Sequence, residues 1–131
     1  MILLDTHVLV WLAVEPRRLS RPAGTAIRRA TTGGGIAIAS ITLWELAFLF
    51  DRGLLHARGT IDASIQRLID ATGVVVKEIT PAVAALAMHF PADFPGDPAD
   101  RLIAATARAD GLVLATADER IQASRLVKTV W

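Results

Sequence analysis

The sequence contains no cysteine, so disulfide bonds and zinc sites built on thiolates are excluded. It also has no large excess of either charge, because 14 Lys and Arg residues oppose 13 Asp and Glu residues and leave a net charge of +1. This near balance argues against a general basic coating for nucleic acid, so any positive surface must be a local cluster. A triad hydrolase is unsupported as well, because the chain has no Gly-x-Ser-x-Gly segment.

Long apolar runs are missing too. The most apolar stretch, residues 8–14, is much shorter than the roughly 20 residues that a membrane-spanning helix requires. The first residues lack the basic start and the small-residue cleavage site of a signal peptide. Together with the missing cysteines, these features predict a cytoplasmic protein without a membrane segment.

The apolar content is sufficient for a folded core. The 131 residues are 53% hydrophobic, which is unlike the composition of a disordered chain. The length suits one domain of ordinary size, and no repeat, low-complexity tract or linker divides the chain. We therefore expect residues 1–131 to form a single domain.

Short apolar runs alternate with longer segments of helical character. The expected strands are residues 2–4, 36–39, 74–79, 112–115 and 126–130. The expected helices are residues 6–14, 20–30, 42–52, 61–71, 81–89, 98–109 and 117–123. Ser20 is a suitable N-cap, and Gly53 and Gly73 are suitable C-terminal residues of their helices. This alternation predicts an α/β fold, a three-layer α/β/α sandwich around a mainly parallel central sheet.

Acidic residues stand near the ends of the predicted strands. Asp5 ends the first strand, Glu45 lies in the first turn of the helix after the second, and Asp118 follows the fourth. Asp97 and Asp100 open the helix that precedes the fourth strand. Because right-handed crossovers bring the carboxyl ends of parallel strands to one edge, we expect these side chains to converge. Gathered carboxylates repel one another unless a cation holds them, and oxygen ligands of this kind select Mg²⁺ or Mn²⁺.

Each acid also has an ordinary structural explanation, because helix N-termini favour carboxylates. The candidate caps are the capping boxes Thr42–Glu45 and Thr116–Glu119, the Asp97-Pro98 pair, and Asp5 before the first helix. Taken singly, no acid distinguishes capping from catalysis. Capping does not require acids to project from three crossovers at one sheet edge, so the combination favours a metal site.

Four motifs occur in order along nearly the whole chain. They are Ile2-Leu3-Leu4-Asp5-Thr6-His7, Ser40-Ile41-Thr42-Leu43-Trp44-Glu45-Leu46, Asp97-Pro98-Ala99-Asp100-Arg101-Leu102-Ile103-Ala104-Ala105-Thr106-Ala107 and Leu114-Ala115-Thr116-Ala117-Asp118. Each motif alone is weak, but the ordered set resembles the PIN-domain family, and within it the VapC-type toxins of bacterial toxin–antitoxin pairs. The resemblance implies one PIN-like domain over residues 1–131.

The resemblance also implies an activity. Members of the family are metal-dependent endoribonucleases, and VapC-type toxins inhibit translation. By this resemblance Asp5, Glu45, Asp100 and Asp118 are the catalytic residues and ligands of Mg²⁺ or Mn²⁺. Asp97 and Thr116 support the site. The implied partners are an RNA substrate, a small VapB-type antitoxin and a second copy of the chain in a homodimer.

The densest basic segment has two interpretations. Its members are Arg17, Arg18, Arg21, Arg28 and Arg29. Arg28 and Arg29 are candidates for binding RNA phosphates near the pocket, and the alternative, which we favour, is a solvated helix face.

The three histidines have no metal-ligand spacing, so we interpret them as structural or surface groups. Trp11, Trp44, Phe48 and Phe50 are interpreted as core residues. The helix around Leu43 is apolar on nearly all sides, so we expect more than one of its faces to be buried. The additional face is a candidate dimer contact or antitoxin groove.

Other functions stay open at this point. A phosphatase of the haloacid-dehalogenase kind requires two aspartates one residue apart after the first strand, and Asp5-Thr6-His7 supplies one. A catalytically silent PIN-like binding module and a nuclease that cuts DNA are the remaining alternatives.

Overall fold

The computed structural model describes all 131 residues. A five-stranded sheet of order β3-β2-β1-β4-β5 lies at its centre, and every neighbouring pair is parallel. The strands are β1 (Ile2–Leu4), β2 (Ile36–Ala39), β3 (Val75–Lys77), β4 (Val113–Ala115) and β5 (Thr129–Val130). The predicted α/β class is therefore confirmed, with a sheet that is parallel throughout.

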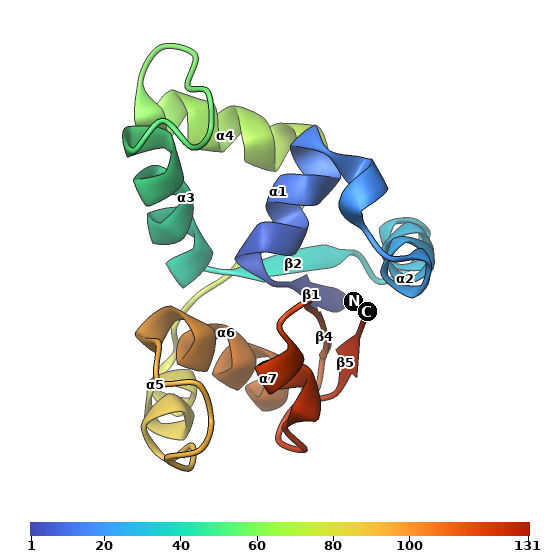
Figure 1. Ribbon diagram of the computed structural model, residues 1–131, viewed down its shortest axis with the longest axis vertical. Helices are drawn as coiled ribbons and strands as arrows, with labels where there is room; N and C mark the ends of the chain where they lie inside the picture. Colours follow the sequence, from blue (N-terminus) through green and yellow to red (C-terminus); the bar gives the residue numbers. More distant parts are fainter.

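Helices cover both faces of this sheet. They are α1 (Thr6–Val14), α2 (Arg21–Thr32), α3 (Ile41–Asp51), α4 (Ile61–Thr72), α5 (Pro81–Met88), α6 (Pro98–Ala109) and α7 (Glu119–Ala123), with a short 3₁₀ helix, η1 (Pro16–Arg18). Figure 1 shows α1, α3 and α4 on one side of the strands and α5, α6 and α7 on the other. None of the helices has the length and hydrophobicity needed to span a bilayer.

The side-chain alternation of the strands separates two cores. Leu3 belongs to the cluster beneath α5 and α6, whereas its neighbour Leu4 belongs to the cluster beneath α1, α2 and α4. This alternation is expected because successive side chains of a strand point to opposite faces. Both leucines are fully buried, so the short β1 is anchored in the middle of the sheet.

Small residues dominate the core beneath α6. Ala37 and Ala39 of β2 share a buried cluster with Ala104 and Ala107 of α6. Because small side chains need little space between helix and sheet, α6 lies close to the strands. The N-terminus of α6 consequently stands at the edge of the sheet where β1, β2 and β4 end (Figure 1).

The predicted helix ends are largely confirmed. The Ser20 hydroxyl accepts a hydrogen bond from the N–H of Ala23, and Gly73 ends α4 with a φ of 71°. Three strands are shorter than predicted: residues 74–79 reduce to β3 at Val75–Lys77, residues 112–115 to β4 at Val113–Ala115, and residues 126–130 to β5 at Thr129–Val130. The reason is pairing, since β3 has partners only opposite Ala37–Ala39 of β2.

Candidate active site

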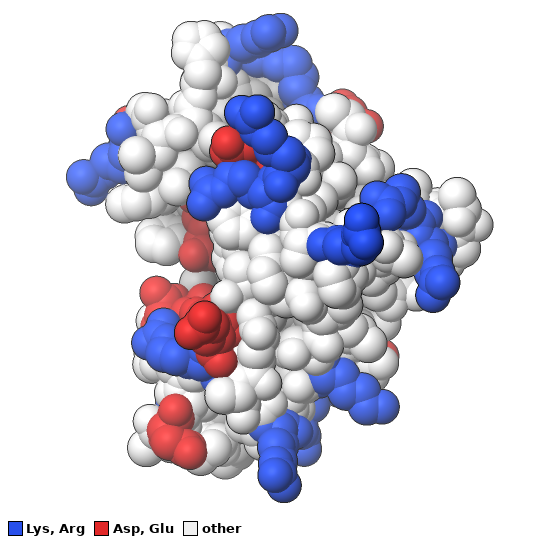
Figure 2. All heavy atoms as spheres, turned by 45° about the vertical axis from the view of Figure 1, so that its right-hand side comes forward, with Lys and Arg blue, Asp and Glu red and all other residues white.

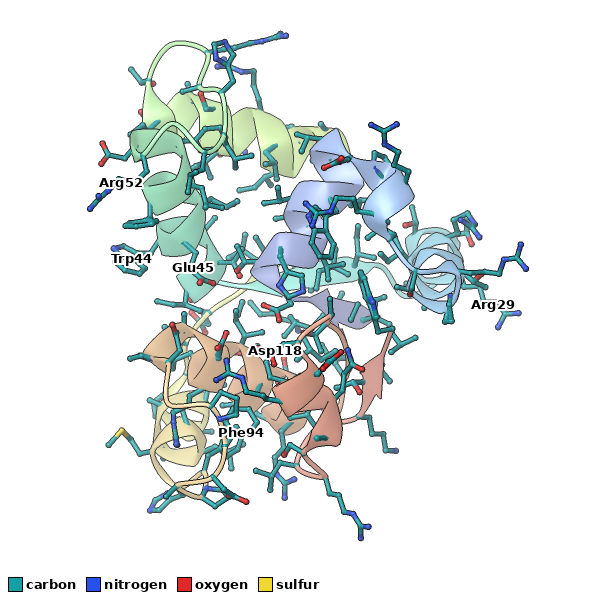
Figure 3. All side chains as sticks on the ribbon, viewed as in Figure 1. Arg29, Trp44, Glu45, Arg52, Phe94 and Asp118 are labelled. Atoms are coloured by element: carbon teal, nitrogen blue, oxygen red, sulfur yellow. The ribbon has the colours of Figure 1, made fainter.

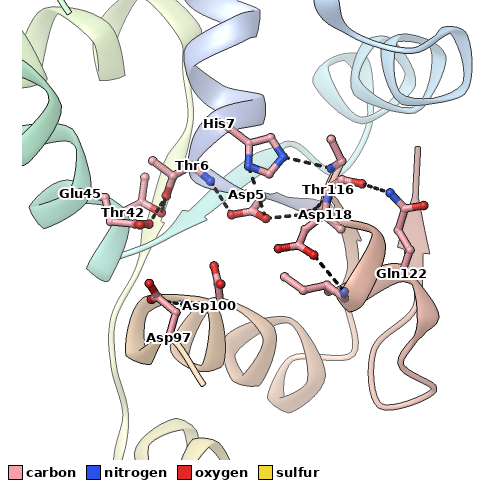
Figure 4. Close-up of polar contacts among 12 residues, drawn as sticks. Asp5, Thr6, His7, Thr42, Glu45, Asp97, Asp100, Thr116, Asp118 and Gln122 are labelled. Carbon is pink, nitrogen blue, oxygen red and sulfur yellow. Dashed lines mark hydrogen bonds and ion pairs between the residues drawn. The ribbon is translucent and has the colours of Figure 1, made fainter. Parts of the chain in front are cut away.

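Asp5 stands where the central strand β1 gives way to α1. Its side chain is almost completely buried, and its Oδ1 accepts a hydrogen bond of 2.8 Å from the N–H of Thr6, so it caps α1. Its Oδ2 accepts a hydrogen bond of 2.7 Å from the hydroxyl of Thr116, which follows β4. Capping and a place in the site are thus compatible at this residue, because the two oxygens have different partners (Figure 4).

Glu45 is held by two threonines. Its Oε1 accepts a hydrogen bond of 2.5 Å from the hydroxyl of Thr6, and that hydroxyl lies 2.9 Å from the hydroxyl of Thr42. Because Thr6 has one hydroxyl proton and gives it to Glu45, Thr42 must donate to Thr6. The capping-box interpretation of Thr42–Glu45 was wrong: α3 begins at Ile41, Ser40 is its N-cap without a side-chain bond, and Thr42 points to α1 instead.

Asp97 and Asp100 open α6. Oδ1 of Asp97 accepts hydrogen bonds from the N–H groups of Ala99 at 2.8 Å and Asp100 at 3.3 Å, which confirms the predicted cap. The carboxyl group of Asp100 accepts no hydrogen bond and extends from the first turn toward Asp5 (Figure 4). Asp97 therefore fixes the start of α6, and the position of Asp100 in the first turn directs its carboxyl group into the site.

Thr116 and Asp118 lie between β4 and α7. Oδ1 of Asp118 accepts hydrogen bonds from Arg120 N–H at 2.9 Å and from Ile121 N–H at 3.3 Å, so Asp118 is the cap of α7. The predicted Thr116–Glu119 capping box was wrong, because the Thr116 hydroxyl donates to Asp5 and accepts from the N–H of Asp118 at 3.1 Å. Thr116 thus links two of the acidic residues.

These elements enclose one acidic pocket of about 410 Å³ at the predicted edge of the sheet. Asp5, Glu45, Asp97 and Asp100 line it, and Asp118 lies near enough to Asp100 to raise the pKa of that residue through its charge. The remaining lining residues are Thr6, His7, Trp44, Phe48 and Leu49. Figure 2 shows acidic side chains gathered around an indentation of the surface, with one basic side chain against them and other Lys and Arg residues spread over that face.

Negative charge is concentrated in the pocket, and it changes the pKa of two of the carboxyl groups. Burial and the negative charges of Asp5, Asp97, Asp118 and Glu45 raise the pKa of Asp100 to about 7. Burial also raises the pKa of Glu45, with the charges of Asp5 and Asp97 adding to the effect and the Thr6 hydroxyl opposing it. No Lys or Arg lines the pocket, although the guanidinium of Arg120 lies 3.5 Å from Oδ2 of the neighbouring Asp118.

This donor set fits a hard divalent cation, which accepts carboxylate oxygens and relieves their repulsion. No three of the side chains lie close enough together to ligate one ion directly. Coordination therefore requires rotation of a side chain or a bridging water, and Mg²⁺ typically keeps several waters.

His7 is part of the site, although its sequence spacing gave no reason to place it there. Its ring lines the pocket, its Nε2 accepts a hydrogen bond of 3.0 Å from the N–H of Ala117, and its Nδ1 lies 3.7 Å from Oδ2 of Asp5. Ala117 is 110 residues away from His7 along the chain, so local sequence spacing could not reveal this contact.

Two further interpretations change. Trp44 and Phe48 were predicted to be core residues, but they are 65% and 44% exposed on α3 at the rim of the pocket, because no other element covers this face.

Arg28 and Arg29 are exposed on α2, and Figure 3 shows Arg29 on the opposite side of the molecule from Glu45. The exposure of these two arginines and their distance from the pocket agree with the interpretation of α2 as having a solvated basic face.

Comparison with known proteins settles the family. The PIN domain model matches residues 2–125 of the chain. The chain belongs to the PIN-domain family. Ribonuclease VapC22 of Mycobacterium tuberculosis is 42% identical to this PIN domain over 132 residues, which cover 99% of the chain and 98% of that protein.

Solved structures show the same fold. VapBC2 from Rickettsia felis, bound to a DNA fragment from its promoter, has a TM-score of 0.72 at 17% identity, covering 98% of this chain and 97% of that one. VapBC from Salmonella typhimurium, also bound to DNA, has a TM-score of 0.70 at 19% identity, with the same coverage. The PIN-like architecture predicted from the four motifs is therefore confirmed.

Proposed function

We propose that this PIN domain hydrolyses RNA phosphodiester bonds at the acidic pocket, with Mg²⁺ or Mn²⁺, as the toxin of a VapBC-type pair that inhibits translation. The chain is a VapC-type ribonuclease by its full-length similarity to Ribonuclease VapC22. The observation that carries the metal-dependent mechanism is the pocket itself, which is lined by four carboxylates from three segments and by no Lys or Arg, with Asp118 of a fourth segment close to Asp100.

The metal ligands follow from the side chains that reach the pocket. We assign Asp5, Glu45, Asp100 and Asp118 as ligands, directly or through water. When bound, a divalent ion of this kind neutralises phosphate charge, lowers the pKa of a coordinated water and stabilises the leaving oxygen. Such an ion also allows anionic RNA to approach an anionic pocket, which the carboxylates alone would repel.

The other residues hold these ligands. Thr6 orients Glu45 through its hydroxyl and Asp5 through its N–H, and Thr116 orients Asp5 through its hydroxyl. Asp97 fixes the first turn of α6 and so the direction of Asp100. In the reaction, a water oxygen forms a bond to phosphorus while the bond from phosphorus to one ester oxygen breaks. Ligands held in fixed positions favour this reaction because little reorganisation is required.

Two protein partners complete the proposal. The structural neighbours are toxin–antitoxin complexes, which supports a small VapB-type antitoxin as a partner of this chain. A homodimer is the second expected assembly. The exposed Trp44 and Phe48 on α3 support a protein contact near the pocket, since large apolar side chains rimmed by polar ones are typical of interfaces.

A cleavage assay with the purified chain tests the proposed activity. We expect Mg²⁺ or Mn²⁺ to support cleavage of labelled single-stranded RNA, and we expect EDTA to abolish it. Single-stranded DNA of the same sequence distinguishes an RNA-cutting from a DNA-cutting enzyme. A folded wild-type chain that cleaves neither polymer with either metal would indicate a silent binding module.

A further inference from the structure

His7 lies between the two segments that carry Asp5 and Asp118. It belongs to the first turn of α1, and the N–H of Ala117 donates to its Nε2 over 3.0 Å. Ala117 stands between Thr116 and Asp118 in the connection from β4 to α7. The imidazole therefore joins the segment after the first strand to the segment after the fourth.

This contact fixes the state of the ring. A backbone N–H is a donor, so Nε2 must accept with its lone pair and cannot carry a proton. In the neutral ring the proton is then on Nδ1, which faces Oδ2 of Asp5 at 3.7 Å. His7 thus presents an acceptor to the β4–α7 connection and an N–H dipole to the carboxylate.

Aromatic packing holds the ring in this position. Trp11 lies one turn further along α1 and meets the His7 ring in a T-shaped arrangement with 5.0 Å between centroids. Trp131, after β5, packs against Trp11 with 5.6 Å between ring centroids, and the Arg18 guanidinium lies 4.4 Å from the Trp11 ring centre. The Trp11 ring therefore holds the His7 imidazole in place, and the imidazole lines the pocket.

We propose that His7 is a positioning residue, which fixes residues 116–118 against Asp5 and so sets the arrangement of the acidic ligands around the metal. This role rests on the proposed function. Without the bond to Ala117, the connection keeps only the single Thr116–Asp5 hydrogen bond as its link to β1 and α1 on the pocket side. Asp118 keeps its bonds to Thr116 and to the start of α7, so the loss of the His7 contact loosens residues 116–118 as a unit against Asp5.

Two substitutions separate the hydrogen bond from the packing. His7→Gln places an amide oxygen near the position of Nε2, so it keeps an acceptor for Ala117 but removes the ring. His7→Phe keeps the ring against Trp11 but removes the acceptor. Circular dichroism confirms that both variants are folded, and Asp5→Asn serves as the control that removes a ligand outright.

Two readouts test the role without relying on activity. Mn²⁺ affinity is measured by electron paramagnetic resonance, and hydrogen exchange of the Ala117 amide is measured by NMR in the presence of EDTA. We expect His7→Gln to resemble the wild type in both. We expect His7→Phe to lose protection at Ala117 and to bind Mn²⁺ about tenfold more weakly, as is typical when a residue that orients a ligand is lost.

The outcomes discriminate between the two proposals. An unchanged Ala117 exchange rate or an unchanged Mn²⁺ affinity in His7→Phe overturns the positioning role and leaves the proposed function intact. The same holds if His7→Gln is as impaired as His7→Phe, because packing would then decide the effect. A wild-type chain that binds no Mn²⁺ overturns the metal mechanism, and the role of His7 in it fails as well.

Discussion

Asp5 and Asp100 face the same pocket but are held in opposite ways. Asp5 is almost fully buried and receives hydrogen bonds from Thr6 and Thr116, whereas Asp100 is half-buried and its carboxyl group receives none. The pKa of Asp100 is raised to about 7 by burial and by its acidic neighbours. Of these two proposed ligands, Asp5 is therefore held by hydrogen bonds from the protein, and Asp100 would need a nearby cation to be stable as an anion.

Under the proposed metal mechanism, this contrast gives the two sides of the pocket different roles. The β1 side of the pocket is rigid, since three threonine hydroxyls fix Asp5 and Glu45. The α6 side offers the Asp100 carboxyl group, which accepts no hydrogen bond from the protein. Such a combination suits Mg²⁺, which demands near-octahedral geometry and binds proteins through few carboxylates. Changes on the two sides should consequently have different effects on activity and stability.

The largest effect is expected from Asp5→Asn. Asparagine keeps the cap of α1 but removes the negative charge from Asp5, the proposed ligand that the protein holds with two hydrogen bonds. We expect RNA cleavage to fall by more than about 100-fold, beyond the usual cost of losing a residue that merely orients a ligand. Single-turnover cleavage of labelled RNA measures this, with circular dichroism as the fold control. Cleavage at the wild-type rate would remove Asp5 from the site.

A smaller loss is expected when the support of Asp5 is removed. Thr116→Val keeps the shape of a fully buried side chain but deletes the hydroxyl that donates to Asp5. We expect cleavage to fall about 10-fold and the free energy of unfolding to fall by about 1–3 kcal/mol, because Asp5 and the Asp118 N–H lose a partner. Thr116→Ser is the matched control and should retain both properties. Equal behaviour of Val and Ser would show that the hydroxyl is dispensable.

Replacing Asp100 should stabilise the fold at neutral pH, whereas Thr116→Val should destabilise it. In the folded chain its carboxyl group holds a proton up to about pH 7, whereas its ordinary pKa is 3.8. Between these values the folded state binds more protons than the unfolded state, so the free energy of unfolding should fall as pH rises from 4 to 7. Asp100→Asn should reduce this slope and raise the melting temperature at neutral pH in EDTA.

Thermal unfolding in EDTA over that pH range tests the Asp100 prediction. Added Mg²⁺ should raise the melting temperature of the wild type at neutral pH and have a smaller effect on Asp100→Asn, since binding to the folded state stabilises it. A wild-type melting temperature that rises steadily with pH in EDTA would contradict the assigned repulsion.

The smallest effect is expected at α2. Arg28 and Arg29 are exposed, and Figure 3 places Arg29 far from Glu45. Replacing both with Gln should leave the salt dependence of RNA binding almost unchanged, because neither side chain would contact a phosphate near the pocket. Filter binding at several salt concentrations measures the slope. A slope reduced by about two for the double variant would assign both arginines to the RNA footprint.

The sequence was sufficient to predict the sheet edge but not the bonds across it. Asp5, Glu45 and Asp118 could be placed because each follows a strand of the alternating pattern, and parallel strands end at a common edge. The partners of Thr42 and Thr116 could not be predicted in this way. Both threonines had capping-box spacing, yet they bond to residues 36 and 111 positions away, and local spacing carries no information about such pairs.

His7 and the aromatic residues show the same limit. The acceptor role of His7 depends on Ala117, which only the folded sheet brings to α1. Trp44 and Phe48 looked like core residues because composition reveals an apolar helix but not which of its faces is covered. Asp97, in contrast, caps α6 as predicted, since capping depends only on the next three residues.

Mn²⁺ binding to the wild-type chain and to Asp5→Asn, measured by isothermal titration at neutral pH, tests the central claim most directly. If the gathered carboxylates form a metal site, the wild type binds Mn²⁺ at the pocket and Asp5→Asn loses at least an order of magnitude in affinity. Equal binding by both chains, or none by the folded wild type, would contradict the account.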